Sequence, residues 1–366
     1  MKKNFSSIIH LMYSGLGGAS SIVFSLIDNK ITNNSKHQVL FLGEKLLIYH
    51  KYYCKKKKIK FTFIKKKKFK DYVKTVFLTF KRIQIIKPDI IFIHDFNIIP
   101  CLFYKFFYKK TKLIFINHTT LKSQNSWKIS LACKFLFFID AFIILNKEDY
   151  NLIIKKYNLH SKKIFLIKNG VNTNYFSNKI IKNKKNFFKI GMACRIDASR
   201  PYRLVAQSLI DPLIKNLNIV FSLCGEGNDI KKFKKFLCNQ NLENKVIFEN
   251  FLHGNNLKKW YSSLDLYVQA SFGEGMSTAL LQAMSMKIPV IGSNSPGIKN
   301  FLDSKKYFGM LFENNVKDLS KKINFFYKLD NKERKKYINT QYQLIKSKYS
   351  SNKMIDEYKS LINRIL

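Results

Sequence analysis

The stretch LDLYVQASFGEGMSTALLQAMSMKIPVIGS, residues 264–293, holds a strand, a loop, a helix and a second strand in that order. Its two strand runs, LDLYVQA and IPVIG, are largely apolar on consecutive positions, which is typical of strands covered on both faces. Ser277 is predicted to cap a helix that runs from about Thr278 to Met286. Two buried strands joined by a helix predict a parallel β-α-β unit.

The same alternation of apolar runs with longer helical segments continues along the chain. The first half contains SIIHLMY, QVLFLG, IKFTFI, DIIFIHD, KLIFIN, AFIIL and IFLI, and the second half adds FKIGMA, NIVFSLCG and KVIFEN. The pattern restarts after the polar, lysine-rich segment NTNYFSNKIIKNKKNFF, so a linker is predicted near residues 175–187. A chain of 366 residues is also too long for one ordinary core.

These patterns predict an α/β fold with two Rossmann-like domains, at residues 1–180 and 181–348. Ligands of parallel sheets bind at the carboxyl ends of the strands, so the two domains are expected to face a central cleft that holds the substrate. The final segment, 349–366, is predicted to be an amphipathic helix. Its apolar face consists of Met354, Ile355, Tyr358, Leu361, Ile362 and Leu366.

The chain is strongly basic, with 66 Lys and Arg against 23 Asp and Glu and a formal net charge of +43. Lysine that has accumulated on solvated faces by compositional drift is one interpretation. Attraction to an anionic membrane surface or an anionic substrate is the other. Nucleic acid is not expected as a partner, because few of the basic residues are the arginines that bidentate contacts to bases and phosphates favour.

The sequence predicts a cytoplasmic protein, either free or peripheral on the inner face of the cytoplasmic membrane. Its six cysteines are scattered without a Cys-x-x-Cys pair, and are interpreted as reduced packing residues. The N-terminal MKKNFSSIIHLMYSG has only a short apolar run and is predicted to be a strand, not a signal peptide. The longest apolar stretch, LACKFLFFIDAFIIL, falls short of the ~20 apolar residues of a membrane span.

Two polar residues stand out in the opening stretch. Glu274 lies between two glycines, just ahead of the predicted helix, and Gln282 lies inside that helix. Glu274 is either a ligand-binding carboxylate or a turn residue that interacts with the helix dipole. Gln282 is either a binding residue or an amide hydrogen-bonded within the helix packing.

Two further loops have a composition suited to phosphate. The turn YSGLGGASS precedes a helix predicted to begin near Ser20. Its glycines let the backbone approach an anion at the start of that helix. The alternative is that a tight turn requires glycine for its geometry alone. The loop GMACRIDASRPYR carries Arg195, Arg200 and Arg203 in a chain that otherwise uses lysine. A guanidinium matches phosphate oxygens, so this loop is predicted to bind phosphate; a basic surface loop is the alternative.

Histidines follow two strands of the first half, His118 in FINHTT and His94 with Asp95 in FIHDF. A functional role and a structural one are both open for them. The chain has no D-x-D pair, Walker A loop, H-E-x-x-H or G-x-S-x-G motif, and no metal site is predicted.

With these residues in order, the chain resembles the retaining glycosyltransferases of GT-B fold, family 4. The resemblance runs from GLGGA through KPDIIFIHD, NHTT, IKNGVNTNYF, CRIDASR and LCGEGND to FGEGMSTALLQAMSMKIPVIGS. It is most specific at the E-x7-E pattern, in which Gln282 replaces the second acid. It implies that the last helix crosses back onto the first domain.

The resemblance also implies a nucleotide-sugar donor, UDP- or GDP-linked, with no cofactor and no metal. Gly17, Gly18, Arg195 and Arg200 would then hold the donor diphosphate. Glu274, Gly275, Met276, Ser277 and Gln282 would contact the donor sugar, its phosphate or the ribose. His118 and Glu274 would be the catalytic residues. Asn300 stands where the family has an acid, a second acid-to-amide departure.

The predicted function is therefore retaining, metal-independent sugar transfer to a lipid-linked glycan acceptor in cell-surface polysaccharide or lipopolysaccharide synthesis. The acceptor is expected in the first domain. A nucleotide-sugar 2-epimerase and a degenerate, non-catalytic nucleotide-sugar-binding protein are the alternatives, and a basic nucleic-acid-binding protein comes last.

Overall fold

The chain divides into two units, each built on its own parallel sheet. The computed structural model describes residues 7–15, 17–29, 31–32, 35–66, 71–94, 97–120, 134, 136, 138–157, 162–177, 186–299, 301–302 and 310–365. One unit consists of Met1–Asn169 with Asn352–Leu366, and the other of Gly170–Ser351. Most of the predicted linker, with Asp95, Asn300 and Leu366, lies outside the described residues.

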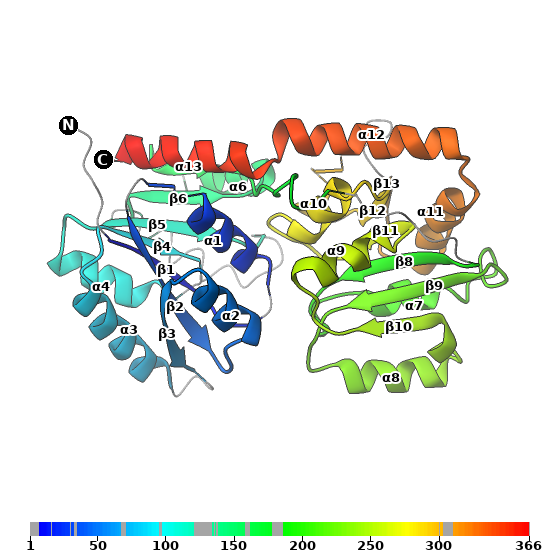
Figure 1. The fold of residues 1–366 in the computed structure, drawn as a ribbon, viewed down its shortest axis with the longest axis horizontal. Helices are drawn as coiled ribbons and strands as arrows, with labels where there is room; N and C mark the ends of the chain where they lie inside the picture. The colour runs from blue at the N-terminus through cyan, green and yellow to red at the C-terminus, as the bar shows by residue number, and fades with distance from the viewer. Residues whose placement is uncertain are drawn as a thin grey trace. The chain divides into compact units, whose positions relative to one another are not determined.

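The first unit is built on a parallel sheet of seven strands in the order β3-β2-β1-β4-β5-β6-β7 (Figure 1). Their bounds are β1 Ser7–Tyr13, β2 Lys36–Gly43, β3 Lys60–Lys65, β4 Ile90–Ile93, β5 Lys112–Asn117, β6 Ala141–Ile144 and β7 Ile164–Leu166. Strands β4 and β6 are buried at every residue, and β5 at every residue but its first. Their consecutive apolar residues are therefore explained by helices on both faces.

Two separate apolar clusters cover the faces of this sheet. The helices are α1 Ala19–Asp28, α2 Ile48–Lys56, α3 Tyr72–Ile86, α4 Ile99–Phe107, α6 Lys147–Tyr157 and α13 Ser351–Ile365. Ile83 of α3 and Tyr104 of α4 belong to one cluster. Phe24 of α1 and Tyr53 of α2 belong to the other, where their rings stack at 3.7 Å between centroids.

The second unit is built on a parallel sheet of six strands in the order β10-β9-β8-β11-β12-β13. Their bounds are β8 Phe188–Ala193, β9 Ile219–Cys224, β10 Val246–Glu249, β11 Leu266–Gln269, β12 Val290–Ser293 and β13 Met310–Phe312. In both sheets the first three strands run outward in one direction and the fourth returns beside the first. This is the strand order of a Rossmann fold.

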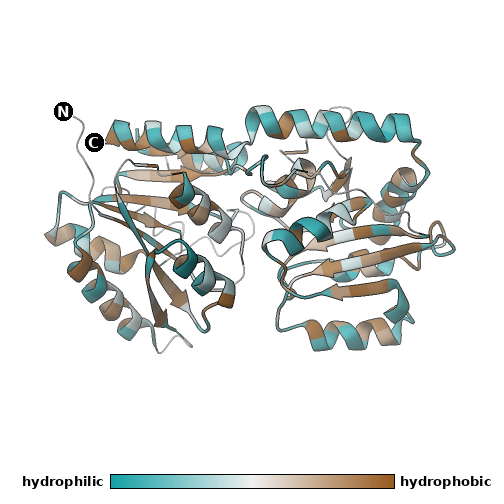
Figure 2. Cartoon of the chain, in the orientation of Figure 1, coloured by the Kyte–Doolittle hydropathy of each residue, from teal (hydrophilic) through white to brown (hydrophobic). Residues whose placement is uncertain are grey.

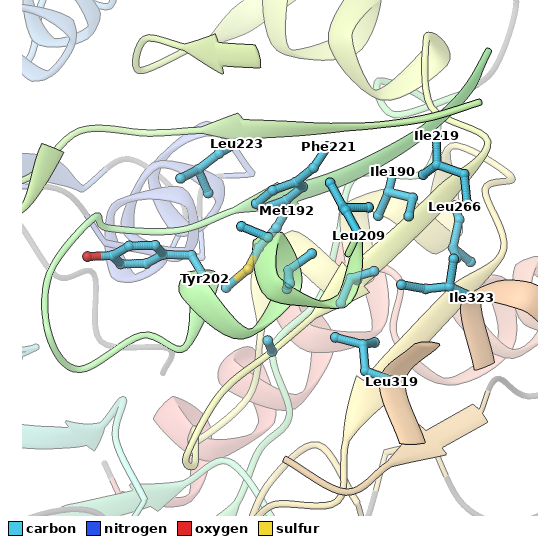
Figure 3. Close-up of a cluster of buried hydrophobic side chains, with 14 of the residues drawn as sticks. Ile190, Met192, Tyr202, Leu209, Ile219, Phe221, Leu223, Leu266, Leu319 and Ile323 are labelled. Carbon is cyan, nitrogen blue, oxygen red and sulfur yellow. The ribbon is translucent and has the colours of Figure 1, made fainter. Parts of the chain in front are cut away.

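The helices of the second unit also pack on two faces. They are α7 Tyr202–Ser208, α8 Ile230–Asn239, α9 Gly254–Ser262, α10 Thr278–Ser285, α11 Val316–Lys328 and α12 Asn331–Lys348, with the short 3-10 helix η3 Glu243–Lys245. Figure 3 shows the cluster in which Leu319 and Ile323 of α11 join Ile190 and Phe221 of the sheet. The other face carries α9, α10 and α12 around the buried Tyr261. Hydropathy follows this plan, since the strands are mainly brown in Figure 2.

The chain passes between the two units twice, and the two crossings lie beside each other. Val171 pairs with Ser350 in an isolated bridge, and the Ser351 N–H donates to the Val171 carbonyl at 2.8 Å. A Cβ on Gly170 would lie 2.5 Å from the Ser350 carbonyl oxygen, so only glycine allows this approach. Beyond the second crossing, α13 buries its predicted apolar face, and Tyr358 lies against Phe92 of β4 at 6.2 Å between ring centroids.

The predicted fold class, with two parallel Rossmann-like α/β domains, is confirmed. Every apolar run named above forms a strand, and the helices predicted near Ser20 and Thr278 begin at Ala19 and Thr278. The sequence pattern missed β13, which has only three residues. The packing role predicted for the cysteines is wrong for Cys238, which is exposed on α8.

The contact of α13 with the first sheet can be tested at Tyr358. Its side chain is 1% exposed, and its hydroxyl is buried without a hydrogen-bond partner in the described part of the chain. Tyr358→Ala should cost about 3–5 kcal/mol of unfolding free energy, because it leaves a cavity. Tyr358→Phe should be neutral or stabilising by up to about 1 kcal/mol, since it removes an unsatisfied polar group. Urea unfolding of both variants measures these changes in unfolding free energy. Equal urea midpoints for Tyr358→Ala and Tyr358→Phe would show that the packing of α13 does not stabilise the unit.

Candidate functional site

Polar side chains of the second unit gather where its strand order reverses. The segment after β8 carries Arg195 and Arg200, and the segment after β11 carries Glu274. β8 and β11 are neighbours in the sheet, paired in parallel through Ile190 and Leu266. The loops that follow them therefore leave the same edge on either side of the reversal, where open α/β sheets bind ligands.

Arg200 and Glu274 form an ion pair at this edge. Arg200 Nη1 donates to Glu274 Oε1 and also to Ser271 Oγ, the latter at 3.0 Å. The side chains are 23% and 11% exposed, so the pair is largely shielded from water. The Glu274 carboxylate is the main cause that raises the pKa of the Arg200 guanidinium. The arginine is accordingly charged at every physiological pH.

Each partner of this pair keeps hydrogen-bonding capacity. Arg200 Nε is buried and has no partner among the described residues. The side-chain hydrogen bonds that Glu274 makes within the described ranges all fall on Oε1, so Oε2 has no partner there. The pair thus presents one N–H and one carboxylate oxygen that a ligand could satisfy.

A row of polar side chains behind Glu274 fixes its position. Gln269 Nε2 donates to Glu274 Oε1 at 2.9 Å. Gln269 Oε1 in turn accepts from Tyr267 and Ser277, each at 2.9 Å. Ser277 Oγ also accepts from the Leu280 N–H at 3.2 Å, which confirms it as the cap of α10. The same network therefore holds the carboxylate and the first turn of the helix.

The backbone of the Glu274 loop is held by the turn after β12. The Glu274 N–H donates to the Pro296 carbonyl at 3.0 Å. Gly297 has a φ of +80°, and a Cβ there would lie 1.8 Å from the Glu274 carbonyl oxygen. Glycine at 297 is thus required both by its left-handed conformation and by the close approach.

Arg195 is more exposed than Arg200. Its Nε lies 3.4 Å from Asp197 Oδ2, and its side chain is 43% exposed. Cys194 beside it is an unreactive thiol, because burial raises its pKa to about 12. Arg195 is therefore a solvent-facing cation with a loose partner, while Arg200 is the fixed one.

Gly275, Met276 and Gln282, the other predicted donor-binding residues, lie in or beside α10. Gly275 is buried, and Met276 packs against the apolar cluster around α10. Gln282 is 9% exposed and accepts a hydrogen bond from the Tyr261 hydroxyl at 3.1 Å. Gln282 is thus an amide hydrogen-bonded within the helix packing, one of the two roles that the sequence allowed. Its contact with a ribose stays a prediction.

The Gly-rich turn of the first unit follows β1. Gly17 and Gly18 are exposed, and a Cβ on Gly17 would meet nothing within 4 Å. Helix α1 begins directly afterwards without a side-chain cap. The Ser21 N–H donates to the Gly18 carbonyl at 3.2 Å, while the N–H groups of Ala19 and Ser20 have no partner among the described residues and can meet an anion.

His118 follows β5, and His94 follows the neighbouring strand β4. His118 Nε2 and His94 Nδ1 share a hydrogen bond of 3.0 Å. Burial lowers the pKa of His118 to about 4, so its imidazole is neutral at pH 7. Its Nδ1 has no hydrogen-bond partner among the described residues, and the side chain is partly exposed, so this nitrogen can meet a ligand.

The sequence missed the supporting residues Tyr267, Gln269, Ser271 and Ser293. Their signal was polar residues that interrupt the ends of apolar strands, in LYVQAS and VIGS. Within the described ranges, no group of three or more His, Cys, Asp or Glu side chains is placed to hold a metal. No helix in those ranges is long and apolar enough to span a bilayer.

Two family models match the chain in sequence. The model for Glycosyltransferase Family 4 matches residues 17–175, and the model for Glycosyl transferases group 1 matches residues 176–344. Together the two models extend from the Gly-rich turn to α12.

Curated relatives agree with these models. An uncharacterized glycosyltransferase of Methanocaldococcus jannaschii is 26% identical over 72% of this chain and 71% of its own length. The O-antigen chain mannosyltransferase of Salmonella typhimurium is 30% identical over 39% of each chain. A UDP-Gal:alpha-D-GlcNAc-diphosphoundecaprenol alpha-1,3-galactosyltransferase of Escherichia coli is 29% identical over 47% of each.

Solved structures share the fold across the chain. The Anabaena protein HepE, in a crystal structure with UDP and glucose, has a TM-score of 0.80 at 14% identity and covers 98% of this chain and 100% of its own. A sucrose-phosphate synthase from Thermosynechococcus elongatus has a TM-score of 0.79 at 11% identity, with 98% of each chain covered. With two Rossmann-like sheets, both family models and relatives in O-antigen synthesis, the chain belongs to the group 1 glycosyltransferases of GT-B fold.

Proposed function

We propose that this glycosyltransferase takes its sugar from a nucleoside-diphosphate donor bound at the carboxyl edge of the second sheet. The Arg200–Glu274 pair carries the proposal, because it leaves a buried Arg200 N–H unsatisfied. The same loop also carries Arg195, whose side chain is 43% exposed. A diphosphate supplies the oxygens that such groups bind. The uncapped start of α1, with Gly17 and Gly18, is a second place in the chain that suits an anion.

In this proposal the two partners of the pair divide the donor between them. The guanidinium stabilises the negative charge that builds on the departing diphosphate, a role that does not require a metal. Glu274 Oε2 accepts a hydroxyl of the donor sugar, while Oε1 stays fixed by Arg200 and Gln269. Transfer with retention of anomeric configuration belongs to the same proposal.

The names of the relatives suggest which donor nucleotide and which class of acceptor to test first. UDP occupies the Anabaena structure, so UDP is the first nucleotide to test. The name of the Escherichia coli relative specifies an acceptor on diphosphoundecaprenol, a lipid carrier. We propose a lipid-linked glycan acceptor in cell-surface polysaccharide synthesis for this chain too.

One surface of the first unit, on α3 and α4, has the composition of a membrane-binding surface. Its exposed apolar residues on α3 and α4 are Val73, Phe77, Leu78, Ile85, Phe103, Phe106 and Phe107. Exposed lysines accompany them, Lys74 and Lys81 on α3 and Lys109 and Lys110 directly after α4. Lys81 Nζ lies 4.5 Å from the centroid of the Phe77 ring. Apolar and basic side chains together favour an anionic bilayer. We propose peripheral contact with such a membrane through this α3–α4 surface, whose apolar positions are visible in Figure 2.

Removing Arg195 should weaken nucleotide binding. UDP is expected to raise the melting temperature of the unaltered protein without added metal. A charge-assisted hydrogen bond contributes about 1.5–3 kcal/mol, so Arg195→Ala should weaken UDP binding roughly 10- to 100-fold. Thermal shift with a UDP titration measures this.

The matched control is Arg203→Ala. Arg203 lies on α7 with its guanidinium 5.6 Å from the Phe236 ring, and it should keep the UDP shift. An unchanged shift in Arg195→Ala would remove Arg195 from the phosphate site.

Glu274→Gln should suppress sugar transfer while it leaves UDP binding mostly intact. The amide loses the charge that Arg200 and a sugar hydroxyl use, so turnover should fall at least about tenfold. Sugar transfer or donor hydrolysis measures the loss. Glu333→Gln changes a partly exposed acid of α12 that pairs with Lys336, and this control should retain activity. Equal turnover in the two variants would exclude Glu274 from the mechanism.

The α3–α4 surface predicts salt-sensitive membrane binding. The protein should sediment with phosphatidylglycerol vesicles at low salt and less at high salt, and should not sediment with pure phosphatidylcholine. Phe106→Ser with Phe107→Ser should abolish sedimentation. Ile48→Ser with Tyr52→Ser, two exposed residues of α2, is the matched control. Vesicle binding that survives the α4 pair would place membrane contact elsewhere.

A further inference from the structure

Four histidines form a hydrogen-bonded row across one face of the first sheet. In spatial order they are His37 on β2, His10 on β1, His94 after β4 and His118 after β5. The joining distances are 3.1 Å, 3.3 Å and 3.0 Å along the row. Neighbouring rings are nearly parallel, with interplanar angles of 16–27° and centroids 5.3–5.5 Å apart. The row runs from His37, the second residue of β2, to His118 at the carboxyl edge of the sheet.

Every hydrogen bond in the row has the same polarity. Nδ1 of His37 meets Nε2 of His10, Nδ1 of His10 meets Nε2 of His94, and Nδ1 of His94 meets Nε2 of His118. The rings meet side to side and do not surround a point, in keeping with the absence of a metal-binding group among the described residues. Only two ring nitrogens lie outside these bonds, Nε2 of His37 and Nδ1 of His118.

The row consists of neutral imidazoles at pH 7. Burial lowers the pKa of His37 and of His118 to about 4, and it lowers those of His10 and His94 well below the ordinary value. The neighbouring imidazoles lower the pKa of His10 and His94 further, since each opposes a second positive charge.

A neutral imidazole carries one N–H, which leaves only two ways to make all three bonds. If His118 carries its proton on Nδ1, every ring must carry its proton on Nδ1. If His118 carries it on Nε2, every ring must carry it on Nε2. The four tautomers therefore change together or not at all.

The far end of the row distinguishes these two states. His37 Nε2 is buried without a partner among the described residues. The all-Nε2–H state would leave a buried N–H donor unsatisfied there, whereas the all-Nδ1–H state leaves only a lone pair. Orphaned buried N–H groups are the rarer and costlier of the two.

We propose that His37, His10 and His94 are positioning residues that lock His118 in its Nδ1–H tautomer. His118 then offers a neutral hydrogen-bond donor at the carboxyl edge of the first sheet, and it cannot serve as a base through Nδ1. The ligand atom it meets must be an acceptor, such as a sugar hydroxyl or phosphate oxygen. This role in catalysis rests on the proposed sugar transfer, but the tautomer lock does not.

The lock can be observed directly by NMR. The chain has seven histidines, so 15N-histidine labelling gives few signals. Long-range 1H–15N correlations at about pH 8 should show His37, His10, His94 and His118 all as Nδ1–H, the minor tautomer of free histidine. Mixed tautomers within the row, or Nε2–H at His118, would overturn the proposal in the unaltered protein.

Two substitutions at His37 test whether the state is transmitted along the row. His37→Asp places an acceptor-only group against His10 Nε2. At about pH 9, where an imidazole beside one carboxylate is neutral, this should switch His10, His94 and His118 to Nε2–H. His37→Asn can still donate and should preserve Nδ1–H. His50→Asn removes another buried imidazole of the unit, outside the row, and should leave His118 unchanged.

Turnover provides the second measurement. If sugar transfer uses the His118 donor, His37→Asp should lower kcat roughly tenfold, the loss of about one hydrogen bond, and should leave KM for the donor unchanged. His37→Asn should keep kcat. A switched tautomer with unaltered kcat would separate the lock from catalysis. An Nδ1–H signal at His118 in His37→Asp would overturn the coupling itself.

Discussion

Parallel pairing of one strand with two neighbours is the constraint on which both units depend. β1 pairs with β2 on one side and β4 on the other, and β8 pairs with β9 and β11. Crossover helices must then leave in opposite directions from that strand. In the first unit the loops after β1 and β4 therefore diverge at the carboxyl edge of the sheet, and in the second unit the loops after β8 and β11 do the same. The candidate residues of each unit lie at this separation, because it is where exposed backbone and side chains can surround a ligand.

Within the second unit, a charged pair is held where water has limited access. Transfer of the Arg200 and Glu274 charges out of water costs desolvation free energy, and the attraction within a buried ion pair need not exceed that cost. Here Ser271 and Gln269 add hydrogen bonds that offset part of this cost. The unsatisfied Arg200 Nε costs free energy as long as it has no partner, and in the proposed function the donor diphosphate supplies that partner.

Much of this architecture could be predicted. Buried parallel strands are apolar at consecutive positions, so β1, β4, β8 and β11 were visible as uninterrupted runs. Arg200 and Glu274 were each identifiable, as an arginine in a lysine-rich chain and as an acid between glycines. Their ion pair was not, because 74 residues separate them and spacing does not encode which loops share an edge. Gln269 was overlooked for the same reason, since its partners come from the loop, the strand and the helix.

The sequence alone determined the strand and helix pattern, the two-domain division of the fold and the residue types suited to a diphosphate. These follow from local periodicity and from side-chain chemistry, which neighbours along the chain already express. The tertiary structure decided which of those residues meet. His37, His10, His94 and His118 are far apart in sequence, and only the spatial order β2-β1-β4-β5 places them in one row. Hydrogen bonds require atoms within about 3 Å, and that proximity is created by strand pairing across the sheet.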